Sequence, residues 1–164
     1  MKKVLVLALF VLLSSGAHAE YSQVNMTVFG MDCAPCAHAI HVSMMGIKGV
    51  DTVKVDLNTG LVNISLSPGN SAGLHQFEEA VEKNGFTHKD ATVVVRGTLS
   101  GSADAPVLEV TGTSDHYALA PSGQPAADIA ALMGKSVIVN GLLPQAAKGK
   151  LPNTLRYKTI TEAQ

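Results

Sequence analysis

The spacing of apolar residues over positions 23–85 constrains the fold of this chain more than any other feature. Apolar and polar residues alternate over residues 23–29, 50–55 and 61–66, which is the pattern of half-buried strands. Two stripes with helical spacing separate these segments, and their members are Ile40, Ser43, Met44 and Ile47, then Leu74, Phe77 and Val81. We expect Gly49 to end the first helix and Asn84-Gly85 to end the second. With a further strand from Phe86 to Lys89, the predicted order is βαββα(β), and both helices cover one face of an antiparallel sheet.

The second half of the chain contains short apolar segments bounded by Gly, Pro or Ser. We predict strands over residues 92–98, 107–111, 116–119, 136–139 and 155–160, with a short helix over 126–133. Five strands with one helix after the third favour a small Greek-key barrel of the OB type. A polar joint around Thr87 to Thr92 is expected to separate the two parts. The predicted fold class is α+β, followed by a small all-β, OB-like barrel.

The first nineteen residues have the pattern of a secretory signal peptide. Lys2 and Lys3 precede an uncharged apolar run from Val4 to Leu13, and Ala17-His18-Ala19 supplies a small-x-small cleavage site. The apolar run is well short of the roughly 20 residues that a membrane-spanning helix needs. We therefore predict cleavage after Ala19 and export of the mature chain to a bacterial periplasm, where it is not embedded in a membrane.

Composition excludes several classes of protein. The hydrophobic share is 46%, which is enough for a packed core and argues against intrinsic disorder. Twelve Lys and Arg oppose thirteen Asp and Glu, aromatic residues make up 4%, and Trp is absent, so a nucleic-acid partner is not expected. The chain has only two cysteines, which excludes a disulfide-dense scaffold.

Both cysteines belong to one Cys-x-x-Cys segment, Cys33-Ala34-Pro35-Cys36, at the predicted start of the first helix. Backbone N–H groups and the helix dipole favour anions there, and hence the thiolate form. Two thiolates at this spacing suit one soft ion, such as Cu(I), Hg(II) or Ag(I). A structural disulfide and a thioredoxin-like redox motif are the alternatives, while no second Cys or His pair completes a structural zinc site.

The segment Gly30-Met31-Asp32-Cys33-Ala34-Pro35-Cys36, the βαββα order and Gly85-Phe86 resemble the heavy-metal-associated domain family. This family includes copper chaperones and the periplasmic mercuric-ion carrier. The resemblance covers residues 20–89, leaves the barrel at 92–164, and implies a ferredoxin-like βαββαβ fold. It also implies a non-enzymatic carrier in which Cys33 and Cys36 bind Cu(I), with Hg(II) as the main alternative. Met31 would support the loop and Phe86 would shield the thiolates.

Transfer in this family proceeds by thiolate exchange between partners, so the resemblance also implies a membrane metal transporter or a sensor domain as partner. Three further side chains have a position from which they could add a ligand. His38 and His41 follow the Cys pair on the first helix, and His88 follows Phe86. A solvated surface position is the alternative for each of the three. Met45 lies off the apolar stripe, where its thioether could assist Cu(I).

Overall fold

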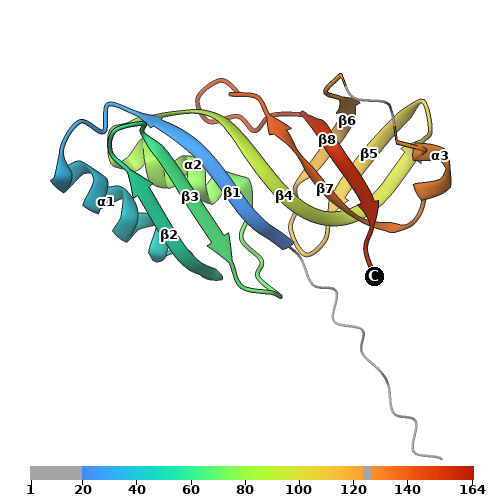
Figure 1. Ribbon diagram of the computed structural model, residues 1–164, viewed down its shortest axis with the longest axis horizontal. Coiled ribbons are helices and arrows are strands. Elements are labelled where there is room, and N and C mark those ends of the chain that lie inside the picture. The colour runs from blue at the N-terminus through green and yellow to red at the C-terminus, as the bar shows by residue number, and fades with distance from the viewer. Residues whose placement is uncertain (1–19, 124–126) are drawn as a thin grey trace, which may run out of the picture.

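The computed structural model describes residues 20–123 and 127–164, and most of them belong to one continuous sheet (Figure 1). The predicted signal peptide lies outside the described residues. The elements are β1 (Glu20–Phe29), α1 (Ala34–Met45), β2 (Val50–Asp56), β3 (Leu61–Leu66), α2 (Leu74–Lys83), β4 (Thr87–Ser102), β5 (Ala105–Val110), β6 (His116–Pro121), α3 (Ile129–Leu132), β7 (Ser136–Leu143) and β8 (Thr154–Glu162). The strand order is β2-β3-β1-β4-β5-β6-β8-β7. None of the helices described is long and apolar enough to cross a membrane.

The first half has the predicted βαββαβ order, and the apolar stripes of both helices are buried. Ile40 and Met44 of α1 and Leu74, Phe77 and Val81 of α2 pack into the core with alternate residues of β1 and β3. The first helix is shorter than predicted: it ends at Met45, with Gly46 as its C-cap. Gly49 has a φ of +97° and lies in the turn that leads to β2, which explains why glycine is favoured there. Ile47 is only partly buried as a result.

The second half closes into a barrel of five strands, as predicted. Strand β4 pairs with β5 on one side and with β7 on the other, and β8 joins β7 to β6. All pairings are antiparallel except β6 with β8, and α3 lies between the third and fourth barrel strands. The pairing of β4 with β7 closes the order β4-β5-β6-β8-β7 into a ring. Its interior is filled by buried side chains, among them Val95, Leu99, Leu108, Tyr117, Val139 and Leu155.

The polar segment at Thr87 to Thr92 is not a break between the two halves, contrary to the prediction. It is part of β4, whose residues 87–96 pair with β1 while residues 91–98 pair with β7. Thr87, Lys89 and Asp90 are exposed, whereas His88 and Ala91 are buried. The exposed polar side chains therefore lie on a strand that belongs to both halves (Figure 1).

A buried polar cluster also joins the barrel to the first half. Asp115, in the turn between β5 and β6, accepts a hydrogen bond from the Tyr21 hydroxyl at 2.8 Å and from the Leu74 amide at 2.9 Å. The Tyr21 and Tyr117 hydroxyls are 2.6 Å apart. Burial is the main cause that raises the pKa of both tyrosines, and the charge of Asp115 adds to it. Both phenols therefore stay protonated and are able to donate.

Asp115 supplies the cap that the α2 sequence lacks. The N-cap residue of α2 is Gly73, which has no side-chain oxygen to offer to the first amides of the helix. The carboxylate of Asp115 takes that place from the barrel, and a Cβ at position 73 would lie 3.3 Å from its Oδ2 atom. Glycine therefore leaves the space that the carboxylate occupies.

We predict that Glu78, on α2, makes the stability of the chain depend on pH. Burial, with smaller contributions from Glu82 and Asp115, raises the pKa of Glu78 to about 7. In the unfolded chain its pKa is about 4.3. Between these two values the folded state binds more protons, so the free energy of unfolding falls as the pH rises through this window, and stays lowered above it.

The substitution Glu78→Gln removes this penalty. It should raise the free energy of unfolding by about 1–2 kcal/mol at pH 8, with the gain disappearing towards pH 4. Urea unfolding at both pH values measures the difference. Glu79→Gln is the control, because Glu79 is exposed, forms an ion pair with Lys83 at 2.9 Å and has a lowered pKa caused mainly by that lysine. An equal gain from both variants at pH 8 would contradict the prediction.

Candidate metal centre

The Cys-x-x-Cys segment forms the N-terminal turn of α1. Cys33 is the N-cap residue, with extended backbone, and its Sγ atom accepts a hydrogen bond from the Cys36 amide at 3.2 Å. The Ala37 amide donates to the Cys33 carbonyl at 3.0 Å, while Pro35 occupies the first turn, where an N–H would have no helical partner. Gly30 opens the loop with a φ of +83°, a conformation that favours glycine. The sequence thus places both sulfurs where backbone amides favour negative charge.

The two sulfurs are joined in the structure as a disulfide, with a Cα–Cα distance of 5.1 Å. Cys33 is exposed and Cys36 is partly exposed, so a reductant or a partner thiolate has access to the bond. A disulfide lacks the thiolates that hold a soft cation. Metal binding at this pair therefore requires prior reduction, in which two electrons and two protons convert the disulfide into two thiols.

Met31 and Phe86 lie around this loop. Met31 is buried in the core of the first half. Phe86 is partly buried against that core, and its Cδ1 atom is 3.5 Å from the position of a Cβ at Gly30. The aromatic ring is thus adjacent to the start of the loop, on the chain segment that follows α2. Their roles in support and shielding remain predictions.

His88 lies on β4, where it is buried rather than solvated. Its Nε2 atom is 3.9 Å from a carboxylate oxygen of Glu82, and its Nδ1 atom is 3.4 Å from the Lys89 carbonyl oxygen. Both ring nitrogens therefore face groups other than the sulfurs in this structure. A role as an additional ligand stays a prediction. Within the part of the chain that the structure describes, no three His, Cys, Asp or Glu side chains form a metal-binding group.

A family model matches the part of the chain that contains this loop. Residues 25–87 match the model described as the heavy-metal-associated domain. This segment is a heavy-metal-associated domain. The match includes Cys33 and Cys36, both helices and the first three strands from Asn25 onward, and it ends as β4 begins. No curated protein matches the chain.

Solved structures resemble the same part of the chain. One is a "CopZ metallochaperone", which is 28% identical, covers 41% of this chain and 98% of its own, and has a TM-score of 0.39. A putative copper-ion-binding protein from Bacillus anthracis str. Ames is 30% identical, covers 43% and 97%, and has the same TM-score of 0.39. Oxidized MerP from Ralstonia metallidurans CH34 is 19% identical, covers 42% and 94%, and also has a TM-score of 0.39.

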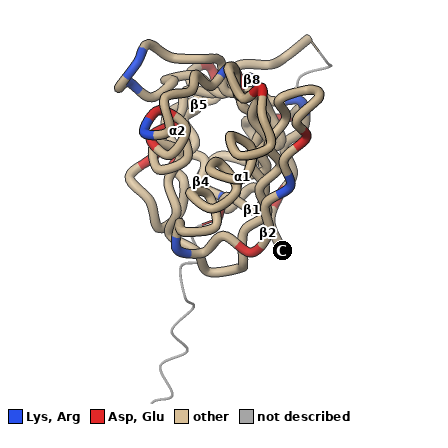
Figure 2. The backbone as a smooth tube through the Cα atoms, turned by 90° about the vertical axis from the view of Figure 1, so that its left-hand side faces the viewer, with Lys and Arg blue, Asp and Glu red and all other residues tan. Residues whose placement is uncertain are grey.

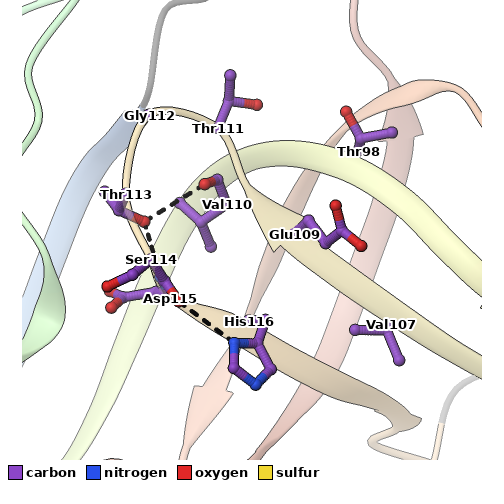
Figure 3. A pocket seen from close by; sticks show the side chains of 10 residues that line it. All are labelled: Thr98, Val107, Glu109, Val110, Thr111, Gly112, Thr113, Ser114, Asp115 and His116. Carbon is purple, nitrogen blue, oxygen red and sulfur yellow. Dashed lines mark hydrogen bonds between the residues drawn. The ribbon is translucent and has the colours of Figure 1, made fainter.

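The barrel contains a hollow of about 510 Å³ over the β5–β6 hairpin, shown in Figure 3. Its lining includes the consecutive residues Ser114, Asp115 and His116, an order of residues that could suggest a hydrolase. They do not form a catalytic triad. The His116 Nδ1 atom is 3.2 Å from the Ser114 main-chain carbonyl oxygen, and Asp115 is hydrogen-bonded to Tyr21 and Leu74.

The buried cluster of Asp115, Tyr21 and Tyr117 was not predicted from the sequence. Tyr21 and Asp115 are 94 positions apart, and the turn around Asp115 has the composition of any surface loop. One signal was present: α2 begins after a glycine, which leaves its first amide without a local side-chain acceptor.

Proposed function

We propose that this chain is a soft-metal carrier that holds Cu(I) between the thiolates of Cys33 and Cys36 after their disulfide has been reduced. The observation that carries the proposal is the position of both cysteines in the N-terminal turn of α1, inside the segment that matches the heavy-metal-associated domain. Soft sulfur donors prefer Cu(I) to hard cations. The helix N-terminus stabilises the negative charge of two thiolates before the cation arrives.

Accessible sulfurs permit the cation to leave as well as to enter. Cys33 is exposed, so a thiolate of a partner can reach a cation bound at this end of the helix. Transfer would then replace one Cys–Cu bond after another with bonds to the partner, with no change of oxidation state. We expect the partner to be a membrane metal transporter or a sensor domain that presents its own thiolates.

The Cys33–Cys36 disulfide fits the proposed export of the chain, because the periplasm is an oxidising compartment. Thiols in that compartment form disulfides unless a donor reduces them. A dithiol protein would supply the two electrons and two protons and would itself become a disulfide. The carrier would thus bind copper only while it is kept reduced, which makes loading dependent on the redox state of the compartment.

Competition with a chromophoric Cu(I) chelator tests the proposal. The reduced chain should withdraw one Cu(I) per molecule from the chelator, and Cys33→Ser/Cys36→Ser should weaken binding by at least a thousandfold, because the variant lacks both thiolates. Ser43→Ala on the same helix is the control, and it should bind as the unaltered chain does. Equal affinity of the Cys variant and the unaltered chain would refute the proposal.

Hg(II) is the second candidate cargo, because two thiolates in near-linear coordination suit it equally well. A matched titration of the reduced chain with Hg(II), followed by exchange against Cu(I) in the presence of excess competing thiol, shows which of the two cations the chain prefers.

The disulfide itself favours a second candidate function, thiol–disulfide exchange. That function predicts turnover with a dithiol substrate, whereas a carrier shows none beyond its own reduction.

A further inference from the structure

The outward face of α1 presents three side chains with metal-binding atoms that the Cys pair does not use. His38 and Met45 are exposed and His41 is partly exposed, while Ile40 and Met44 on the opposite face are buried. The three occupy positions i, i+3 and i+7. At 3.6 residues per turn they lie within about 60° of one another around the helix axis. Neighbouring members of such a set have Cβ atoms about 5–6 Å apart.

The two histidines of α1 differ from the other histidines that the structure describes. His75 lies 3.9 Å from Glu79, His88 contacts Glu82, and His116 contacts the Ser114 carbonyl oxygen. No side-chain hydrogen bond or ion pair links His38 or His41 to any other described residue. Their ring nitrogens are therefore available to an incoming ligand without breaking an existing contact.

The charge of α1 indicates the kind of cation. The helix sequence APCAHAIHVSMM contains no Asp, Glu, Lys or Arg. Figure 2, in which α1 faces the viewer, shows this helix without either charge colour, whereas α2 carries both. Hard divalent cations such as Ca²⁺ and Mg²⁺ require oxygen ligands, which this face does not offer. Two imidazoles and a thioether are instead donors for a soft cation of low charge.

The position of α1 keeps this face open. Figure 1 shows α1 at the end of the molecule that is farthest from the barrel. Its inner face packs against β2 and α2, so the outer face is not covered by any other described element. Val42, between His38 and Met45 on the same face, is 53% exposed and offers an apolar surface beside the three donors. An apolar neighbour lowers the competition from water for a weakly hydrated cation.

We propose that His38, His41 and Met45 form a second site for one soft monovalent cation, Cu(I) or Ag(I), that works while Cys33 and Cys36 are a disulfide. Imidazole and thioether donors need no electrons to become ligands, whereas the Cys pair needs two. The second site lies on the same helix, between two and nine residues after Cys36. It would thus retain a cation on the carrier until reduction frees the thiolates. This role in retention rests on the proposed function, but binding at the second site does not.

The test uses the full chain in its disulfide form and Ag(I) as the probe, since Ag(I) does not change oxidation state. Calorimetry should show one Ag(I) per chain, and NMR should show shifts of the Met45 methyl group and the ring protons of His38 and His41. His41→Gln and Met45→Leu should each lower the affinity at least tenfold. The double variant should lose the site. These side chains are exposed or partly exposed, so the fold should be retained, which amide NMR spectra verify.

Matched controls use residues of the same type elsewhere. His75→Gln on α2 and Met133→Leu beside the barrel should leave the Ag(I) affinity unchanged. The Cys33→Ser/Cys36→Ser chain should bind Ag(I) as the disulfide form does, whereas the proposed carrier function predicts that it loses tight Cu(I) binding. The two proposals therefore fail separately. Absence of Ag(I) binding by the disulfide form, or binding that His41→Gln and Met45→Leu leave unchanged, overturns the second site.

Discussion

Replacing Asp115 with alanine is expected to lower the free energy of unfolding by about 3 kcal/mol. The variant loses the hydrogen bond from Tyr21 at 2.8 Å and the bond from the Leu74 amide at 2.9 Å. It also leaves the hydroxyl groups of two buried tyrosines with only each other as partners. Hydrogen bonds to a charged group contribute about 1.5–3 kcal/mol each, and unsatisfied buried donors add a further cost.

Urea unfolding monitored both by far-UV circular dichroism and by tyrosine fluorescence measures this loss. Asp104→Ala is the control, since Asp104 is an exposed residue in the β4–β5 turn, and its free energy of unfolding should change by less than about 0.5 kcal/mol. Tyr21→Phe should cost about 1 kcal/mol, because it removes one hydroxyl and leaves the cap of α2 in place. Hydrogen exchange should also show faster exchange at the Leu74 amide in the Asp115 variant alone. Equal stability of the Asp115 and Asp104 variants would contradict the assigned role.

Hydrophobic spacing predicted the elements that have one buried and one solvated face. The buried residues Val62, Ile64 and Leu66 alternate along β3, and Leu74, Phe77 and Val81 recur at helical spacing on α2. These patterns follow directly from the geometry of strands and helices, so no long-range information is needed. The order of the strands in the barrel was also predictable, because five short strands with one helix after the third allow few arrangements.

The continuity of β4 could not be predicted in this way. A strand segment rich in exposed polar side chains has the composition of a loop, and Thr87, Lys89 and Asp90 provide that composition here. Only its pairing with β1 and β7, which are distant in sequence, shows it to be a strand. The hydrogen bonds of Asp115 could not be predicted from the sequence either, because only the tertiary fold brings its partners Tyr21 and Leu74 close to it. The donor identity of the Cys site was predictable from spacing, but the redox state of its sulfurs was not.

The shared strand and the buried cluster predict that the heavy-metal-associated domain depends on the barrel for its stability. A fragment that ends at Lys89 lacks the β4 residues that pair with Glu20 to Met26 of β1. It also lacks Asp115 and Tyr117, which cover the Tyr21 hydroxyl. The fragment 20–89 is therefore expected to be largely unfolded at 25 °C, with poorly dispersed amide NMR signals and little Cu(I) affinity at the reduced Cys pair.

A second fragment separates the two causes of this dependence. The fragment 20–98 retains every β4 residue that pairs with β1 but still lacks the cap from Asp115. It should fold, with a free energy of unfolding at least about 3 kcal/mol below that of the chain from residue 20 to 164, and should regain Cu(I) binding when reduced. If fragment 20–89 were instead as stable as the longer chain, the barrel would not contribute to the stability of the heavy-metal-associated domain, and the prediction would be wrong. A graded series in which 20–98 lies between the other two would show that the barrel acts first as a strand partner for β1 and second as the cap of α2.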